Sequence, residues 1–106
     1  MTAVRVLEYL DRSGRSPWRR WFNDLDAHAA AKVGTALYRI GQGNFSTVEG
    51  VGSGVYEARI DSGPGYRIYC RRSGDTVLLL LAGGDKRTQV RDIDRSRRLA
   101  RDLREG

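Results

Sequence analysis

One segment, Gly54 to Gln89, constrains the fold more than any other part of the chain, because it holds three strand-like runs separated by two glycine-bearing turns. The turns are residues 61–65 (DSGPG) and 73–75 (SGD). Glycine supplies the positive φ that tight turns often need, and Pro64 lacks the N–H that a strand ladder requires. The segment therefore predicts three consecutive strands, at Val55–Ile60, Tyr66–Arg71 and Thr76–Ala82.

The third of these strands is a nearly continuous run of apolar residues, in which Val77 is followed by four leucines. A strand of that kind is usually covered on both faces. We therefore expect it to lie in the interior of the sheet, with structure packed above and below it.

The first two strands alternate instead, and successive side chains of a strand point to opposite faces. One face is apolar and is predicted to meet the core. The other face is charged, and two interpretations of it remain open. Guanidinium groups beside a phenol and a carboxylate can bind a phosphodiester, or they can form a solvated outer face with cross-strand ion pairs. The apolar set is Tyr56, Ala58, Ile60, Tyr66, Ile68 and Cys70, and the charged set is Glu57, Arg59, Arg67, Tyr69 and Arg71.

Two helices are predicted ahead of this segment, after an opening strand at Val4–Leu10. Ser16 followed by Pro17 is a strong helix start, with serine as N-cap and proline at the first helical position. The aromatic stripe of this helix favours core packing over base stacking. A second helix is predicted from Ala29 to Ile40, and Gly41 and Gly43 stop it. The aromatic stripe consists of Trp18, Trp21, Phe22 and Leu25.

The remaining segments complete the fold. Asn44–Ser53 is rich in glycine and predicts either a partial edge strand or a loop beside the charged face. The last helix is predicted over Lys86–Leu103, capped by Asp85 or Thr88. Its apolar stripe is short, and its many arginines are expected to face solvent. The stripe is Val90, Ile93, Ala100 and Leu103.

These elements predict a single α+β domain over residues 1–106, in the order β-α-α-β-β-β-α. We expect a mostly antiparallel sheet of four to five strands, packed against an N-terminal helical hairpin and a C-terminal helix.

The net charge of the chain limits the classes of molecule that it is expected to bind. The formal net charge is +6, and polyanions such as RNA or DNA, or an acidic protein, are the partners that a basic surface attracts. His28 is the only histidine, which excludes a histidine-rich zinc site and a two-histidine ribonuclease mechanism. No metal or other cofactor is expected. The lone Cys70, the lack of a signal peptide and the lack of a membrane span favour a cytoplasmic protein.

Two blocks of sequence, GVYEARIDSGPGYRIY and GGDKRTQVRDI, separated by the apolar strand, resemble the RelE/ParE toxin superfamily. More narrowly, the chain is similar to the HigB-like addiction module killer proteins of type II toxin–antitoxin systems. The resemblance runs over nearly the whole chain, from the opening strand and the SPW…WF helix to the final helix.

The resemblance implies a RelE-like fold and a growth-arresting toxin that cleaves ribosome-associated mRNA without a metal. It also implies a cognate antitoxin, typically a small helix-turn-helix DNA-binding protein. Arg59 matches the arginine of the family's E-x-R-I strand and Arg67 that of the GYR-x-Y strand. Lys86, with Arg87 beside it, matches the basic position of the GGDK turn.

These matches carry expected roles. Arg67 would stabilise the charge of the transition state, and Arg59 would position the phosphate. The general base is either Glu57 or Lys86. RNA contacts are expected from Tyr69, Arg71 and Arg87, with Tyr69 stacking on a base or relaying a proton.

Two departures from the family pattern matter. Cys70 stands where many relatives carry an aromatic residue, and no histidine or tyrosine follows Leu103, where some ribonuclease members use one. The second departure keeps an alternative open, namely a ParE-type toxin that inhibits DNA gyrase and cleaves no RNA.

Overall fold

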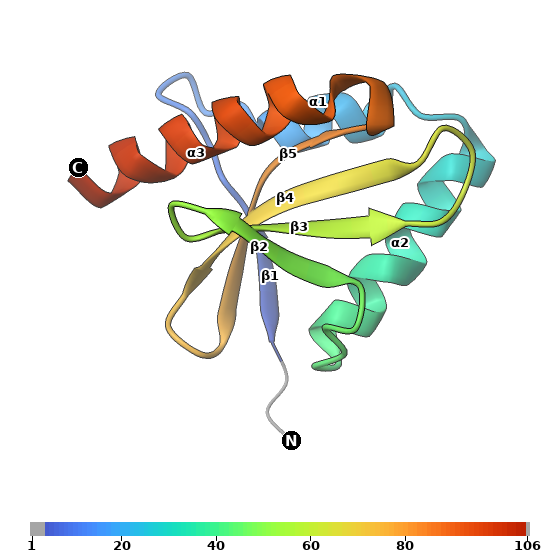
Figure 1. Cartoon of the computed structure of the whole chain (residues 1–106), viewed down its shortest axis with the longest axis horizontal. Helices are drawn as coiled ribbons and strands as arrows, with labels where there is room; N and C mark the ends of the chain where they lie inside the picture. Colours follow the sequence, from blue (N-terminus) through green and yellow to red (C-terminus); the bar gives the residue numbers. More distant parts are fainter. Residues whose placement is uncertain (1–3, 106) are drawn as a thin grey trace.

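A computed structural model of the chain describes residues 4–105, with side chains placed over residues 4–103. Residues 1–3 and 106 of the predicted domain lie outside this part. One five-stranded sheet carries helices on both of its faces (Figure 1). The elements, in chain order, are β1 (Arg5–Glu8), α1 (Pro17–Asn23), α2 (Ala27–Gly41), β2 (Val48–Gly52), β3 (Val55–Ile60), β4 (Tyr66–Ser73), β5 (Val77–Gly84), the 3₁₀ turn η1 (Lys86–Thr88) and α3 (Gln89–Glu105).

The strands lie in the order β1-β5-β4-β3-β2. The pairs from β2 to β5 are antiparallel, whereas β1 runs parallel to β5, so the sheet is mixed. The predicted α+β class is confirmed, and the segment Asn44–Ser53 contributes the fifth strand, at an edge. β5 lies between β1 and β4, as its apolar run predicted. Within residues 4–105, no helix is both long enough and apolar enough to cross a membrane.

Two apolar clusters fill the space on the two faces of the sheet. On one face, α1 and α2 pack over the apolar side of β3 and β4 together with Leu78 and Leu80. The expected core role of the aromatic stripe is confirmed here, since Trp18 is 3% exposed and stacks on Phe22. On the other face, α3 packs over Val55, Leu81 and neighbouring residues. α3 therefore covers the side of the hairpin that was expected to be open.

Capping residues set the helix ends. The Ser16 hydroxyl accepts a hydrogen bond from the Arg19 N–H, and the Asp26 carboxylate accepts one from the Ala29 N–H. The cap at Asp26 starts α2 two residues before the predicted position, so His28 lies in its first turn and is exposed. Gly41 is the last residue of α2 and Gly43 follows directly after the C-cap Gln42, so the predicted end of this helix is confirmed.

α3 differs from its predicted stripe because its sheet-facing side changes character along the helix. Ile93, Ala100 and Leu103 pack as expected, but Val90 is 84% exposed. The buried positions near the start of α3 are polar, with Asp92 4% exposed and Ser96 fully buried. The sheet beneath this end of the helix carries polar groups as well, and these are the residues from which a site can be built.

Candidate functional site

Arg59 and Arg67 lie directly opposite each other on β3 and β4. Residues in register on neighbouring strands place their side chains on the same face, so the expectation that these two guanidiniums share a face is confirmed. β2 pairs with β3 only as far as Ala58, and the Arg59 N–H then donates to the Thr47 carbonyl. Arg59 and Ile60 therefore project beyond the edge strand.

A hollow of about 620 Å³ opens at this point. It contains both arginines and is walled by residues of α2, by the loop before β2 and by Lys86. We call it the Arg59–Arg67 hollow. Five of its lining side chains are basic and one, Asp61, is acidic, so it is a positively charged site. The basic residues are Lys32, Arg39, Arg59, Arg67 and Lys86.

Gly65 lies between Arg67 and Lys86, and its lack of a side chain lets both approach closely. Its φ is +79°, which favours glycine. A Cβ there would lie 3.0 Å from Arg67 Nη1 and 3.5 Å from Lys86 Cβ. In addition, the Lys86 N–H donates to the Pro64 carbonyl. The turn between β3 and β4 thus lies against Lys86, the first residue of η1, and brings it next to the start of β4.

Arg67 is held from two sides. Its Nη1 donates to the Gly65 carbonyl at 2.6 Å, and its Nε lies 3.7 Å from Glu57 Oε2. The side chain is 12% exposed. Nε is buried and makes no hydrogen bond within the described part of the chain. Arg67 is therefore a fixed, largely desolvated cation at the wall of the hollow, while Arg59 is exposed.

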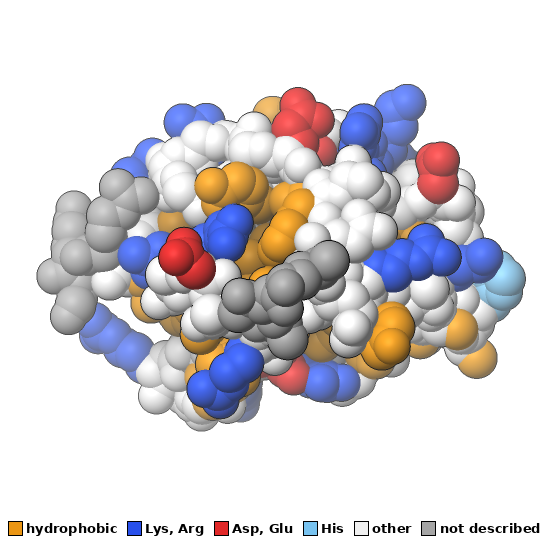
Figure 2. Space-filling model, turned by 90° about the horizontal axis from the view of Figure 1, so that it is seen from below, with side chains coloured by type: hydrophobic (Ala, Val, Ile, Leu, Met, Phe, Trp, Pro, Cys, Tyr) orange, Lys and Arg blue, Asp and Glu red, His pale blue; other side chains and the backbone are white. Residues whose placement is uncertain are grey.

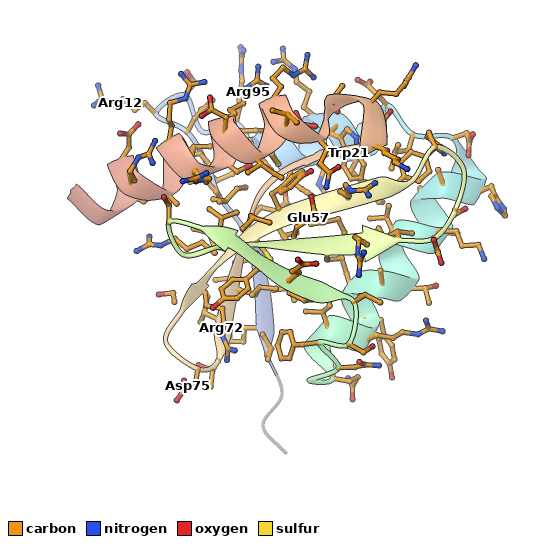
Figure 3. The ribbon with its side chains drawn as sticks, in the orientation of Figure 1. Arg12, Trp21, Glu57, Arg72, Asp75 and Arg95 are labelled. Atoms are coloured by element: carbon orange, nitrogen blue, oxygen red, sulfur yellow. The ribbon has the colours of Figure 1, made fainter. Side chains whose placement is uncertain are left out.

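Glu57 is not the accessible base that was expected. It is 4% exposed and lies between the sheet and α3 (Figure 3). Its Oε2 accepts hydrogen bonds from the Tyr69 hydroxyl at 3.1 Å and from Gln89 Nε2 at 3.0 Å. With Arg67 also beside it, this carboxylate is positioned to hold the arginine, and not to take a proton from a substrate.

Tyr69 is fully buried, so the expectation that it stacks on an RNA base is wrong. Burial and the adjacent Glu57 carboxylate raise the pKa of Tyr69, which keeps its hydroxyl protonated as a donor. The alternative interpretation, in which this face of β3 and β4 is exposed to solvent, is wrong at Glu57 and Tyr69 because both side chains are buried. α3 covers Glu57 and Tyr69.

The other expected RNA contacts do not reach the hollow. Arg71 is four residues along β4 from Arg67, about 13 Å at strand spacing, and pairs with Val55. Arg87 is on the surface, where its guanidinium forms an ion pair with Asp85 at 3.2 Å. Neither residue lines the hollow.

Sequence reasoning missed three residues near the site. Lys32 and Arg39 line the hollow from α2. Their spacing of seven places them on one helix face, and this polar stripe was a signal in the sequence, although only the apolar stripe of the helix was considered. Gln89 was missed because its partner, Glu57, is 32 residues away.

Cys70 is a fully buried residue on the opposite face of β4. Burial raises the pKa of its thiol to about 12, so it is an inert core residue. Basic side chains elsewhere are widely spread. Figure 2 shows several separate groups of lysine and arginine on one face of the molecule, with hydrophobic patches between them. Positive charge alone therefore does not locate a site, and the hollow is distinguished by having five basic side chains in its lining and only one acidic one.

No family model matches the sequence. A protein of Haemophilus influenzae described as uncharacterized is 39% identical to the chain over 84 residues, which are 78% of this chain and 85% of that protein.

Proposed function

This chain belongs to the same family as the uncharacterized Haemophilus influenzae protein, and we propose that it is a metal-independent endoribonuclease, the toxin of a type II toxin–antitoxin system. The observation that carries the proposal is the convergence of Arg59, Arg67 and Lys86 on one hollow at the ends of β3, β4 and β5. Cations from three separate strand ends that meet at one point provide a site for a phosphodiester.

The proposed reaction is a transesterification within the RNA. The ribose 2′-oxygen attacks the adjacent phosphorus, the bond from phosphorus to the 5′-oxygen of the next nucleotide breaks, and a 2′,3′-cyclic phosphate forms. A base takes the 2′-hydroxyl proton, and an acid gives a proton to the departing 5′-oxygen. Negative charge builds up on the nonbridging oxygens in the transition state, where fixed guanidiniums stabilise it most.

Each residue of the hollow has a role in this proposal. Arg67 stabilises the transition state, because its contacts with Gly65 and Glu57 hold it in place. Arg59, which is exposed, positions the phosphate. Glu57 acts through Arg67 as a positioning residue. Of the two residues expected as the general base, Glu57 is buried and Lys86 is exposed, so Lys86 takes part in proton transfer.

The proposed substrate is mRNA, in the setting of the translating ribosome. The proposed protein partner is a cognate antitoxin, a small helix-turn-helix DNA-binding protein encoded beside this chain. These proposals rest on the sequence resemblance together with the basic hollow.

We expect Arg59→Ala and Lys86→Ala each to lower the rate of RNA cleavage about 100-fold. Both side chains are exposed, so the fold should persist. Arg67→Ala is a poorer test, since it leaves the buried Glu57 carboxylate without its cation. The measurement is cleavage of a single-stranded RNA by the purified protein in EDTA, with detection of the cyclic phosphate. Arg12→Ala is the matched control, because Arg12 is exposed in the loop before α1, away from the hollow (Figure 3).

Full cleavage activity in both hollow variants would contradict the proposal. Growth arrest on expression, without new RNA ends but with altered DNA supercoiling, would favour a ParE-type gyrase inhibitor instead.

A further inference from the structure

A second depression, of about 760 Å³, lies between α1 and α3 over the end of β5. We call it the α1–α3 groove. It shares no lining residue with the Arg59–Arg67 hollow. Its floor includes apolar groups from three elements, with Pro17 and Trp21 from α1, Ala82 from β5 and Leu99 from α3. The proposed ribonuclease reaction makes no use of it.

The rim of this groove is rich in arginine, and three of these arginines are unpaired. Arg19 forms an ion pair with Glu8 at 2.6 Å, and Arg91 lies 3.6 Å from Asp92. By contrast, the side chains of Arg15, Arg20 and Arg95 form no ion pair or hydrogen bond with any described residue. All three are exposed, and Figure 3 shows Arg95 on the outer side of α3.

Three acidic residues, Asp11, Asp24 and Asp92, line the groove as well, and Asp24 is exposed at the C-cap of α1. Asp11 accepts hydrogen bonds from the backbone N–H groups of Ser13 and Arg15. Asp92 is 4% exposed and accepts the Thr88 hydroxyl at 2.5 Å. Because five arginines and three aspartates line the groove, the net charge around the apolar floor is positive.

We propose that the α1–α3 groove binds an acidic, amphipathic segment of a partner protein. Aliphatic side chains of that segment would cover the floor, and its carboxylates would pair with Arg15, Arg20 and Arg95. Burial of apolar area provides the affinity, while the arginines set the orientation and exclude basic partners.

Other occupants fit less well. A second copy of this chain carries the same net charge of +6 and would bring arginines against arginines. Single-stranded RNA binds by stacking its bases on aromatic rings. Among the described residues, Trp21 provides the one aromatic ring that lines the groove. It packs against Tyr66, with centroids 6.2 Å apart, and against Gly83, so no second ring is available to stack a neighbouring base.

The test uses the full chain and a synthetic helical peptide with leucines on one face and glutamates on the other. Binding is followed by tryptophan fluorescence, since Trp21 lines the groove whereas Trp18 is 3% exposed. We expect the double variant Arg20→Glu/Arg95→Glu to weaken binding about tenfold or more. Arg5→Glu, an exposed residue of β1 outside both depressions, should bind as the unchanged chain does.

Two control peptides separate the contributions. Replacing the glutamates by lysines, or the leucines by serines, should each abolish measurable binding. Equal affinity of the double variant and the unchanged chain for the acidic peptide would overturn the proposal. Displacement of the peptide by a single-stranded RNA would overturn it too, by assigning the groove to nucleic acid.

The outcome is independent of the proposed nuclease. Because the two depressions share no residues, the double variant should keep any RNA cleavage, and Arg59→Ala should keep peptide binding. A chain that binds the peptide but cleaves no RNA would refute the nuclease and leave this inference intact.

Discussion

Glu57 is a carboxylate inside a small protein, and its neighbours explain how it is accommodated. Burying a charge is costly unless the group is paired and hydrogen-bonded. Here the Tyr69 hydroxyl and the Gln89 amide donate to one oxygen, and Arg67 lies 3.7 Å from it. These contacts fix the Arg67 side chain at the wall of the hollow. The buried network and the candidate site are therefore parts of one arrangement.

We expect Tyr69→Phe to lower the free energy of unfolding by about 1.5–3 kcal/mol, because it removes a hydroxyl donor from a buried carboxylate. Urea unfolding monitored by circular dichroism measures this. Tyr38→Phe is the matched control, since Tyr38 is 68% exposed and its loss should change stability by less than about 0.5 kcal/mol. Equal effects of the two substitutions would show that the hydroxyl of Tyr69 does not support Glu57.

The end of β5 shows how two helices approach one strand from opposite faces. A Cβ on Gly83 would overlap the Trp21 ring of α1, and a Cβ on Gly84 would overlap the Asp92 carboxylate of α3. Neither glycine has a positive φ. Both glycines are the last two residues of β5 and lie in the strand itself. The lack of a side chain at these two positions lets α1 and α3 pack closely against opposite faces of the same strand.

Gly83→Ala should therefore destabilise the protein by about 1–3 kcal/mol, since Trp21 is confined by Trp18 and Tyr66. Gly34→Ala is the matched control. Gly34 lies inside α2 with open space around its Cβ position, so alanine there should stabilise by up to about 1 kcal/mol. Thermal or urea unfolding of both variants distinguishes the effects. A Gly83→Ala chain as stable as the unchanged one would mean that the indole moves aside freely.

At the scale of the whole molecule, the protein carries two depressions of different character. The Arg59–Arg67 hollow is polar and basic, whereas the α1–α3 groove combines an apolar floor with an arginine rim. α3 is common to both, since Gln89 supports Glu57 behind the hollow and Arg95 and Leu99 line the groove. One helix thus supports two separate surfaces.

We expect RNA binding to depend modestly on salt. If Arg59, Arg67 and Lys86 supply the phosphate contacts, the slope of log affinity against log salt should be about −2 for a single strand. Titration of a labelled, non-cleavable RNA at several salt concentrations measures the slope. A much steeper slope, of about −6 or beyond, would mean that the dispersed basic surface and not the hollow binds the RNA.

Much of the fold was predictable because it depends on neighbours in sequence. β3 was predicted residue for residue, since alternation and the turn at 61–65 define it. The cap at Ser16 was predicted because a cap acts over three residues, and Asp85, predicted together with Thr88 as a possible cap of the last helix, caps the turn η1 just before it. The shared face of Arg59 and Arg67 followed from the register of a hairpin.

The sequence by itself determined four of the five strands, the turns between β3, β4 and β5, the start of α1 and the pairing that sets two arginines side by side, because each of these depends on short-range patterns. Only the tertiary structure decided that α3 returns across the charged face and buries Glu57 and Tyr69. Only it brought Lys32 and Arg39 of α2 to the hollow. The physical reason is that the packing of elements far apart in the sequence depends on the shape of the whole molecule. A pattern of neighbouring residues holds no information about that shape.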